Sequence, residues 1–262
     1  MQQARTAEQN TEHHSGKWQH DGMVDRLRSW RLERNGNTSS AAVCSEFARY
    51  TQDSGHTTAA HHNPAWQLVL SWDGPLLVTD HRGRVTTAFG IVIAPRIRRM
   101  VHCPAGFTSL WVDPHRIDTA MQACVHAMEH AQVRRLQTAA RGELDPLRLR
   151  GALREVLGDA PPVDPRLRQV LDLLDSDADI NELAGVVGIS ARRLRQLSVQ
   201  QLGGSLTMLR RWHRLREAVL QIPFHPAADI AARTGFADQA HLVRTAVALG
   251  GRTPGSLRAL RS

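Results

Sequence analysis

The feature that most limits what this chain can fold into is a pair of related segments in its C-terminal part. The segments INELAGVVGISARRLRQL (180–197) and ADIAARTGFADQAHLVRT (228–245) share an apolar–Ala pair, a Gly four residues further on and an apolar residue directly after that Gly. A small Ala lets two helices cross closely, and a Gly in the turn adopts a left-handed conformation at no steric cost. Each segment therefore predicts a helix-turn-helix.

Two copies of this unit are more informative than one, because unrelated helical hairpins share a single copy. The turn residues Gly188 and Gly235 lie 47 residues apart, and the amphipathic segment LTMLRRWHRLREAVLQ lies between the two units. We expect Ser205 to cap this long helix and Pro223 to limit its end. The second helix of each unit fits a major groove about 12 Å wide. The repeat therefore indicates a DNA-binding domain.

Residues 164–262 resemble the AraC/XylS family of transcription regulators. The motif that carries the resemblance begins at Gly235-Phe236, continues through Asp238-Gln239, His241-Leu242 and Arg244, and ends with Gly251 and Thr253-Pro254; residues 214–220 look like the family's linker helix. The resemblance implies that the two recognition helices read successive major-groove segments on one side of the duplex. Transferred by position, it implies that the residues facing DNA are Ala191, Arg192, Arg195 and Gln196 of the first recognition helix and Gln239, Ala240 and Arg244 of the second. The long polar side chains among them, Arg192, Arg195, Gln196, Gln239 and Arg244, are the candidates for DNA contacts.

These residue types suit base reading. Arg can donate two hydrogen bonds to guanine, and Gln pairs with adenine in the same bidentate way. A solvated helix face or a contact with phosphate remains an alternative for each arginine. We expect Asp238 to cap its helix, and His241 to have a structural role or to contact phosphate.

The sequence also departs from the family pattern. The family usually has Phe at the positions of Ser198, Ala246 and Gly250, and often basic residues at those of Val247 and Ala248. Loss of buried Phe side chains predicts that the second unit is repacked or loosened. Fewer basic residues predict weaker anchoring to phosphates.

The N-terminal half has a different pattern. Residues 66–112 contain short apolar segments separated by turns at Asp73-Gly74-Pro75 and His81-Arg82-Gly83, which is typical of an antiparallel sandwich or barrel. The predicted fold class is α+β: a cupin-like β-sandwich or barrel, then helices, then an all-α domain with two helix-turn-helix motifs joined by a linker helix. We expect a mobile segment (1–40), a sensory domain (41–115), a helical dimerisation and linker region (116–160) and a DNA-binding domain (161–262).

Residues 55–74 fit the spacing of the first cupin motif. Metal-binding cupins have His-x-His and Glu where this chain has His61-x-Asn63 and Gln67. The loss of an imidazole and a carboxylate argues against a metal, and no other cofactor is expected. The family resemblance instead implies a small organic effector in the barrel. Candidates for lining its site are His61, Gln67, Arg99 and His102, each of which could equally have a structural role.

Apolar residues recur at a helical period after Pro114. The spacing of Ile117, Met121, Cys124, Met128 and Ala131 predicts a helix. Its stripe of Met121, Cys124 and Met128 could pack on a second copy and form a homodimer, or pack on the chain's own sandwich.

Charge and composition agree with a nucleic-acid partner. The formal net charge is +8, and the segment from Val163 to the end contains 14 arginines but only nine acidic residues. No signal peptide or apolar segment of membrane-spanning length is present, so we expect a cytoplasmic protein with no membrane partner. The three cysteines form no metal or disulfide pattern, although a thiol sensor at Cys103 or Cys124 stays open.

Two enzyme hypotheses compete with the regulator. HAMEH (126–130) matches the HxxEH spacing of a group of zinc peptidases, in which His126, Glu129 and His130 would share a helix. A metal-dependent cupin-type enzyme is the better-founded alternative, but it leaves the repeated helix-turn-helix unexplained. The sequence therefore favours a regulator without catalytic activity.

Overall fold

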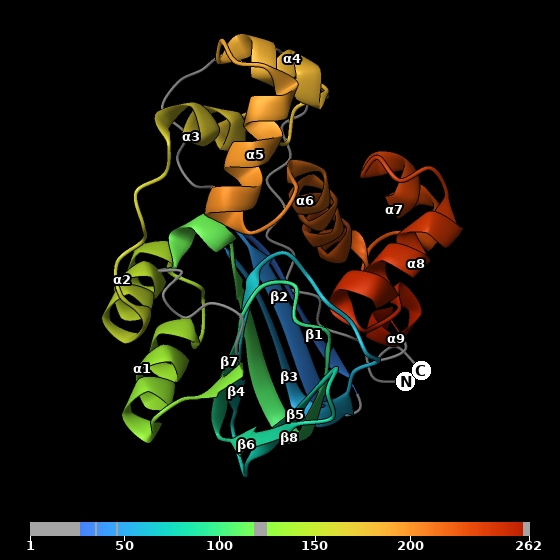
Figure 1. The fold of residues 1–262 in the computed structure, drawn as a ribbon. Helices are drawn as coiled ribbons and strands as arrows, with labels where there is room; N and C mark the ends of the chain where they lie inside the picture. Colours follow the sequence, from blue (N-terminus) through green and yellow to red (C-terminus); the bar gives the residue numbers. More distant parts are fainter. Residues whose placement is uncertain (1–26, 35, 46, 118–124, 259–262) are drawn as a thin grey trace.

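The computed structural model describes residues 27–34, 36–45, 47–117 and 125–258. Its first part is an antiparallel β domain (Figure 1). The strands are β1 (Arg28–Arg34), β2 (Asn37–Val43), β3 (Phe47–Thr57), β4 (Trp66–Ser71), β5 (Leu76–Asp80), β6 (Val85–Ala88), β7 (Gly90–Ile93), β8 (Arg99–Val112) and β9 (Val125–Ala127). The predicted α+β fold with an N-terminal antiparallel β domain is confirmed.

The 14-residue strand β8 organises this sheet. It pairs with β3 along most of its length, with β5 through residues 99–102 and with β4 through residues 107–112. The strand order is β1-β2-β3-β8-β4-β7-β9; off this path, β5 pairs with β8, and β6 pairs with β5. One long strand therefore joins both parts of the sheet.

The prediction of a mobile segment over residues 1–40 is wrong for residues 28–40, which form β1 and most of β2. Trp30 is buried and packs edge-on against Tyr50, with 6.4 Å between ring centroids. The β domain therefore begins at Arg28. Residues 1–26 lie outside the described part of the chain.

The helix predicted from Ile117 is also wrong in its placement. Residues 125–127 form β9, which pairs with β7, and the helix α1 begins only at His130, where Glu129 and Gln132 form a capping box. The backbone N–H of Met128 donates to the carbonyl of Gly90 (2.8 Å). Hydrogen bonds with the free edge of β7 therefore replace a further turn of helix.

The remaining elements are helical. α1 and α2 cover one face of the sheet, whereas α6 and α8 lie on its other side and α3 to α5 lie at one end (Figure 1). After a 3₁₀ turn (Pro114–Arg116) the helices are α1 (His130–Ala140), α2 (Pro146–Leu157), α3 (Pro165–Asp172), α4 (Ile180–Val186), α5 (Ala191–Leu202), α6 (Leu206–Gln221), α7 (Ala227–Arg233), α8 (Gln239–Gly250) and α9 (Pro254–Arg258).

The C-terminal helices share a hydrophobic core with the sheet. One cluster contains Trp30 and Val69 of the β domain together with Trp212 and Leu242 of the helical part. Trp111 and Trp212 pack with ring centroids 5.9 Å apart. The long helix α6 thus packs against the β domain.

Candidate nucleic-acid interface

The first helix-turn-helix is formed by α4 and α5. Asp179 caps α4 by accepting hydrogen bonds from the backbone N–H groups of Asn181 and Glu182. Gly188 has a φ of 67°, which favours glycine, and allows Ile189 N to donate to Ala184 O (3.0 Å). Ser190 then caps α5.

The second unit, α7 and α8, repeats this geometry. Gly235 has a φ of 71°, and Phe236 N donates to Ala231 O (2.9 Å). Asp238 caps α8 by accepting from His241 N (2.6 Å), which confirms its predicted role. The ring of His241 packs against Phe236 with centroids 5.3 Å apart, in agreement with a structural role. The two predicted helix-turn-helix units are confirmed.

α6 joins the two units as the predicted linker helix. Ser205 caps it, and its buried residues include Leu206, Leu209, Trp212 and Leu215. It ends at Gln221, two residues before Pro223.

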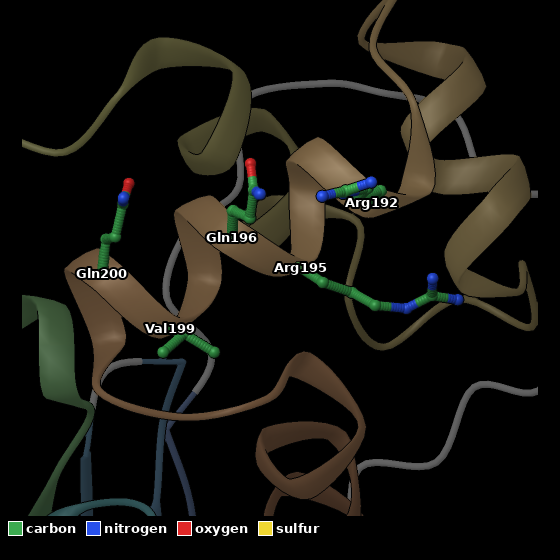
Figure 2. Close-up of a pocket in the computed structure, with 5 residues that line it drawn as sticks. All are labelled: Arg192, Arg195, Gln196, Val199 and Gln200. Carbon is green, nitrogen blue, oxygen red and sulfur yellow. The ribbon is translucent and has the colours of Figure 1, made fainter.

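The outward face of α5 presents the three predicted side chains Arg192, Arg195 and Gln196, all of them exposed. Together with Val199 and Gln200 they line a shallow open hollow on this helix (Figure 2). The sequence interpretation missed Val199 and Gln200. Their spacing of seven and eight residues from Arg192 is the signal that would have included them in the same helical stripe.

α8 exposes Gln239 and Arg244, as predicted. The departures from the family pattern have local explanations. The hydroxyl of the fully buried Ser198 donates to Gly204 O. Ala246 is buried in the shared core, and Gly250 lines a cavity at the β domain.

The four candidate effector residues do not form one site. Arg99, which is 1% exposed, donates to the side chain of Gln67 and to Ile97 O. Burial lowers the pKa of Arg99 to about 9, and burial and Arg99 lower that of His61 to about 3. His102, by contrast, is exposed and bonds Thr57 (2.7 Å). His102 therefore lies apart from the three buried candidates, and an effector-binding role for any of the four stays a prediction.

A small cavity of about 30 Å³ lies beside this cluster. Its lining includes Gln67 and Trp111 of the β domain, together with Gly250 and Arg252 from the end of α8. Burial raises the pKa of Cys103, also in the lining, to about 12, so this thiol stays protonated and is a poor redox sensor. Cys124 lies outside the described residues.

The β domain holds the C-terminal end of α8. Ala59 N donates to Gly251 O (2.9 Å) and His62 N donates to Ala248 O (3.0 Å), so a loop of the β domain satisfies carbonyls that a helix end leaves free. Arg252 donates to Gln52 (3.0 Å), and its guanidinium lies 5.3 Å from the centre of the Tyr50 ring.

Of the predicted dimer stripe, the described part of the chain contains Met128. Met128 is buried in a core cluster of the chain that also contains Val133, which agrees with the alternative that this residue packs on its own chain. Met121 and Cys124 lie outside the described residues.

The geometry required for an HxxEH zinc site is absent. His126 lies on β9, whereas Glu129 and His130 cap and begin α1, so the two histidines do not share a helix. Within residues 27–34, 36–45, 47–117 and 125–258, no three His, Cys, Asp or Glu side chains are grouped to hold a metal. In the same ranges, no helix is long and apolar enough to cross a membrane.

Sequence comparison with known proteins finds similar proteins for the helical part of the chain. A family described as a helix-turn-helix domain matches residues 183–259. The chain is 34% identical over 106 residues to the arabinose operon regulatory proteins of Escherichia coli (strain K12) and Salmonella typhimurium, which is 38% of this chain and 36% and 38% of those proteins. The chain thus spans little more than a third of the length of these curated relatives.

Solved structures show the same fold along nearly the whole chain. ToxT from Vibrio cholerae strain SCE256 with a bound unsaturated fatty acid has a TM-score of 0.51 at 9% identity, covering 91% of this chain and 96% of that one. The apo K231A form of ToxT has a TM-score of 0.53 at 8% identity, covering 93% and 100%. At these identities the likeness shows the fold alone. The chain thus carries a helix-turn-helix domain similar to part of the arabinose operon regulatory proteins, behind an antiparallel β domain in a fold shared with ToxT.

Proposed function

We propose that this protein is a transcriptional regulator that binds double-stranded promoter DNA at a specific sequence and responds to a small molecule. The observation that carries the proposal is the repeated helix-turn-helix, in which both second helices turn polar side chains outward. A DNA partner of this kind implies a cytoplasmic location. The homodimer remains a prediction that no described contact supports.

α5 is the stronger reading element in this proposal. Arg192 and Arg195 each offer a guanidinium that can donate to guanine O6 and N7, and Gln196 offers an amide that fits adenine. On α8, Arg244 and Gln239 have the corresponding chemistry. The excess of arginine in the C-terminal part supplies the attraction to phosphates that precedes base reading.

The response to an effector rests on how the two parts are joined. The β domain contacts α6 through Asp113 and Trp111, and it contacts α8 through residues 59–62. The present volume of about 30 Å³ beside Gln67 holds no more than a water molecule or two, so a ligand there displaces part of the lining, which includes Gly250 and Arg252 from the end of α8. Such a ligand would favour arrangements in which α8 is free.

A small molecule in the β domain is also in keeping with the fold, since ToxT, which shares it, was solved with an unsaturated fatty acid. The expected division into a sensory part (41–115), a linker part (116–160) and a DNA-binding part (161–262) is kept here, with the sensory part extended to β1.

The test is selection of bound fragments from a genomic library, followed by footprinting. We expect a protected site that spans two successive major grooves, and affinity that falls with salt with a slope near −0.9 per neutralised phosphate. The double variant Arg192→Ala/Arg195→Ala should lose selection. The variant Arg134→Ala/Arg148→Ala, which removes the same charge from exposed positions of α1 and α2, should retain it. No footprint on any fragment would contradict the proposal.

A further inference from the structure

The two recognition helices differ in chemistry at matching positions. Ser190 and Asp238 are the caps of α5 and α8, and each helix begins at the next residue, so positions can be counted from the caps. Residues 192, 195, 196 and 199 of α5 thereby correspond to residues 240, 243, 244 and 247 of α8. The first set is Arg, Arg, Gln and Val, whereas the second is Ala, Val, Arg and Val.

This stripe is the outward face of α8. The buried residues of the helix are Leu242, Thr245, Ala246 and Leu249, which lie on the opposite side. Ala240 and Arg244 are exposed, and Val243 and Val247 are partly exposed. Gln239, which is also exposed, matches Ala191 and lies outside this stripe, so apart from Arg244 the four matched positions of α8 are apolar.

An apolar face has one specific partner in the major groove. Ala and Val cannot bond the polar edges of bases, but thymine presents a C5-methyl group there. Arg244 interrupts the stripe with a positive charge, which suits DNA and would be left unpaired against an apolar protein surface. The contacts of residues 59–62 with α8 are made to Ala248 and Gly251, so Ala240, Val243 and Arg244 lie outside them, and Val247, which is partly exposed, borders them.

We propose that α8 recognises thymine through contacts of Ala240, Val243 and Val247 with C5-methyl groups, whereas α5 reads mainly hydrogen-bonding base edges. Val199, which is 57% exposed toward the C-terminal end of the α5 stripe, adds one thymine contact to that half-site. The inference rests on the proposed function, and it predicts an operator with one thymine-rich half.

Uracil in place of thymine is the probe, because it removes the methyl group and leaves base pairing unchanged. In the half-site of α8, we expect two or three single thymine-to-uracil changes to weaken binding by about threefold to fivefold each, the loss of about one buried methyl group. Val243→Ala and Val247→Ala should each abolish the effect at one position. In the half-site of α5, one thymine should be sensitive, and Val199→Ala should remove that sensitivity.

Val85→Ala is the matched control, because Val85 is equally exposed (56%) but lies on β6 of the β domain. This variant should retain the uracil sensitivity of the wild type. A selected operator whose α8 half tolerates uracil at every thymine would overturn the inference and leave the proposed function intact. Retained sensitivity in both α8 valine variants would overturn it as well. Failure to select any sequence would overturn the proposed function itself.

Discussion

His213 of α6 lies 3.1 Å from the carboxylate of Asp113 (Nε2 to Oδ2), which follows β8 at the end of the sheet. The other ring nitrogen of His213 bonds Asp175 (2.8 Å), and Arg216 donates to the second oxygen of Asp113 (3.3 Å). Asp113 is only 1% exposed. A buried carboxylate of the β domain is thus paired with two cationic side chains of the linker helix.

This pairing predicts a pH dependence of stability. Burial and Arg216 lower the pKa of His213, but Asp113 and Asp175 raise it by more, so it lies above its usual value. The stabilisation that His213 gives to the folded protein is therefore complete below about pH 6.5, where the histidine is protonated, and it is lost as the pH rises through the raised pKa. Burial raises the pKa of Asp113, but Arg216 and His213 lower it by more, so the pKa lies below its usual value. The stabilisation that ionised Asp113 gives to the folded protein is therefore lost only as the pH falls below about 3.9.

We expect His213→Gln to lower the free energy of unfolding by about 1.5–3 kcal/mol at pH 5 and by less at pH 9, as measured by denaturant titration. His81→Gln, at an exposed turn between β5 and β6, should have no such dependence. An equal loss for His213→Gln at both pH values would contradict the charge on this histidine.

Gly251 tests the contact between the β domain and α8. A Cβ at this position would lie 2.5 Å from the ring nitrogen of His61 and 2.9 Å from Ala59 O. Gly251→Ala should therefore separate the loop from α8, which hydrogen exchange at residues 59–62 would report as faster exchange. Gly203→Ala is the control, because its φ of 67° imposes the same backbone strain and a Cβ there meets no atom within 4 Å. Equal exchange in the two variants would contradict a tight contact.

Asp238 separates helix capping from base reading. Asp238→Ala removes the acceptor for His241 N and should lower stability by about 1 kcal/mol, as thermal unfolding would show. Asp238→Asn keeps an acceptor and should restore most of that stability. A change of base preference in Asp238→Asn at unchanged stability would instead assign this residue to DNA.

The features that could be predicted best from the sequence are those set by neighbouring residues, such as turns and helix caps. Gly188 and Gly235 mark the two turns and Asp238 marks a cap within a few residues, so both helix-turn-helix units could be placed. β1 was missed because its pairing with β2 is set by the sheet, and only Trp30 and Leu32 mark its buried side. The short strand β9 likewise depends on the free edge of β7. The bond between Arg252 and Gln52 joins residues 200 positions apart, which no periodicity reports.

The most direct test of the central claim is the base preference of Arg195→Ala, measured as affinity for the selected operator and for all single base-pair changes in it. We expect discrimination to fall by about 1–3 kcal/mol at one base pair of the α5 half-site and to be unchanged elsewhere. Arg193→Ala, an exposed arginine of the same helix outside the stripe, should keep the full preference. A uniform loss of affinity on every sequence for both variants would contradict base reading by α5.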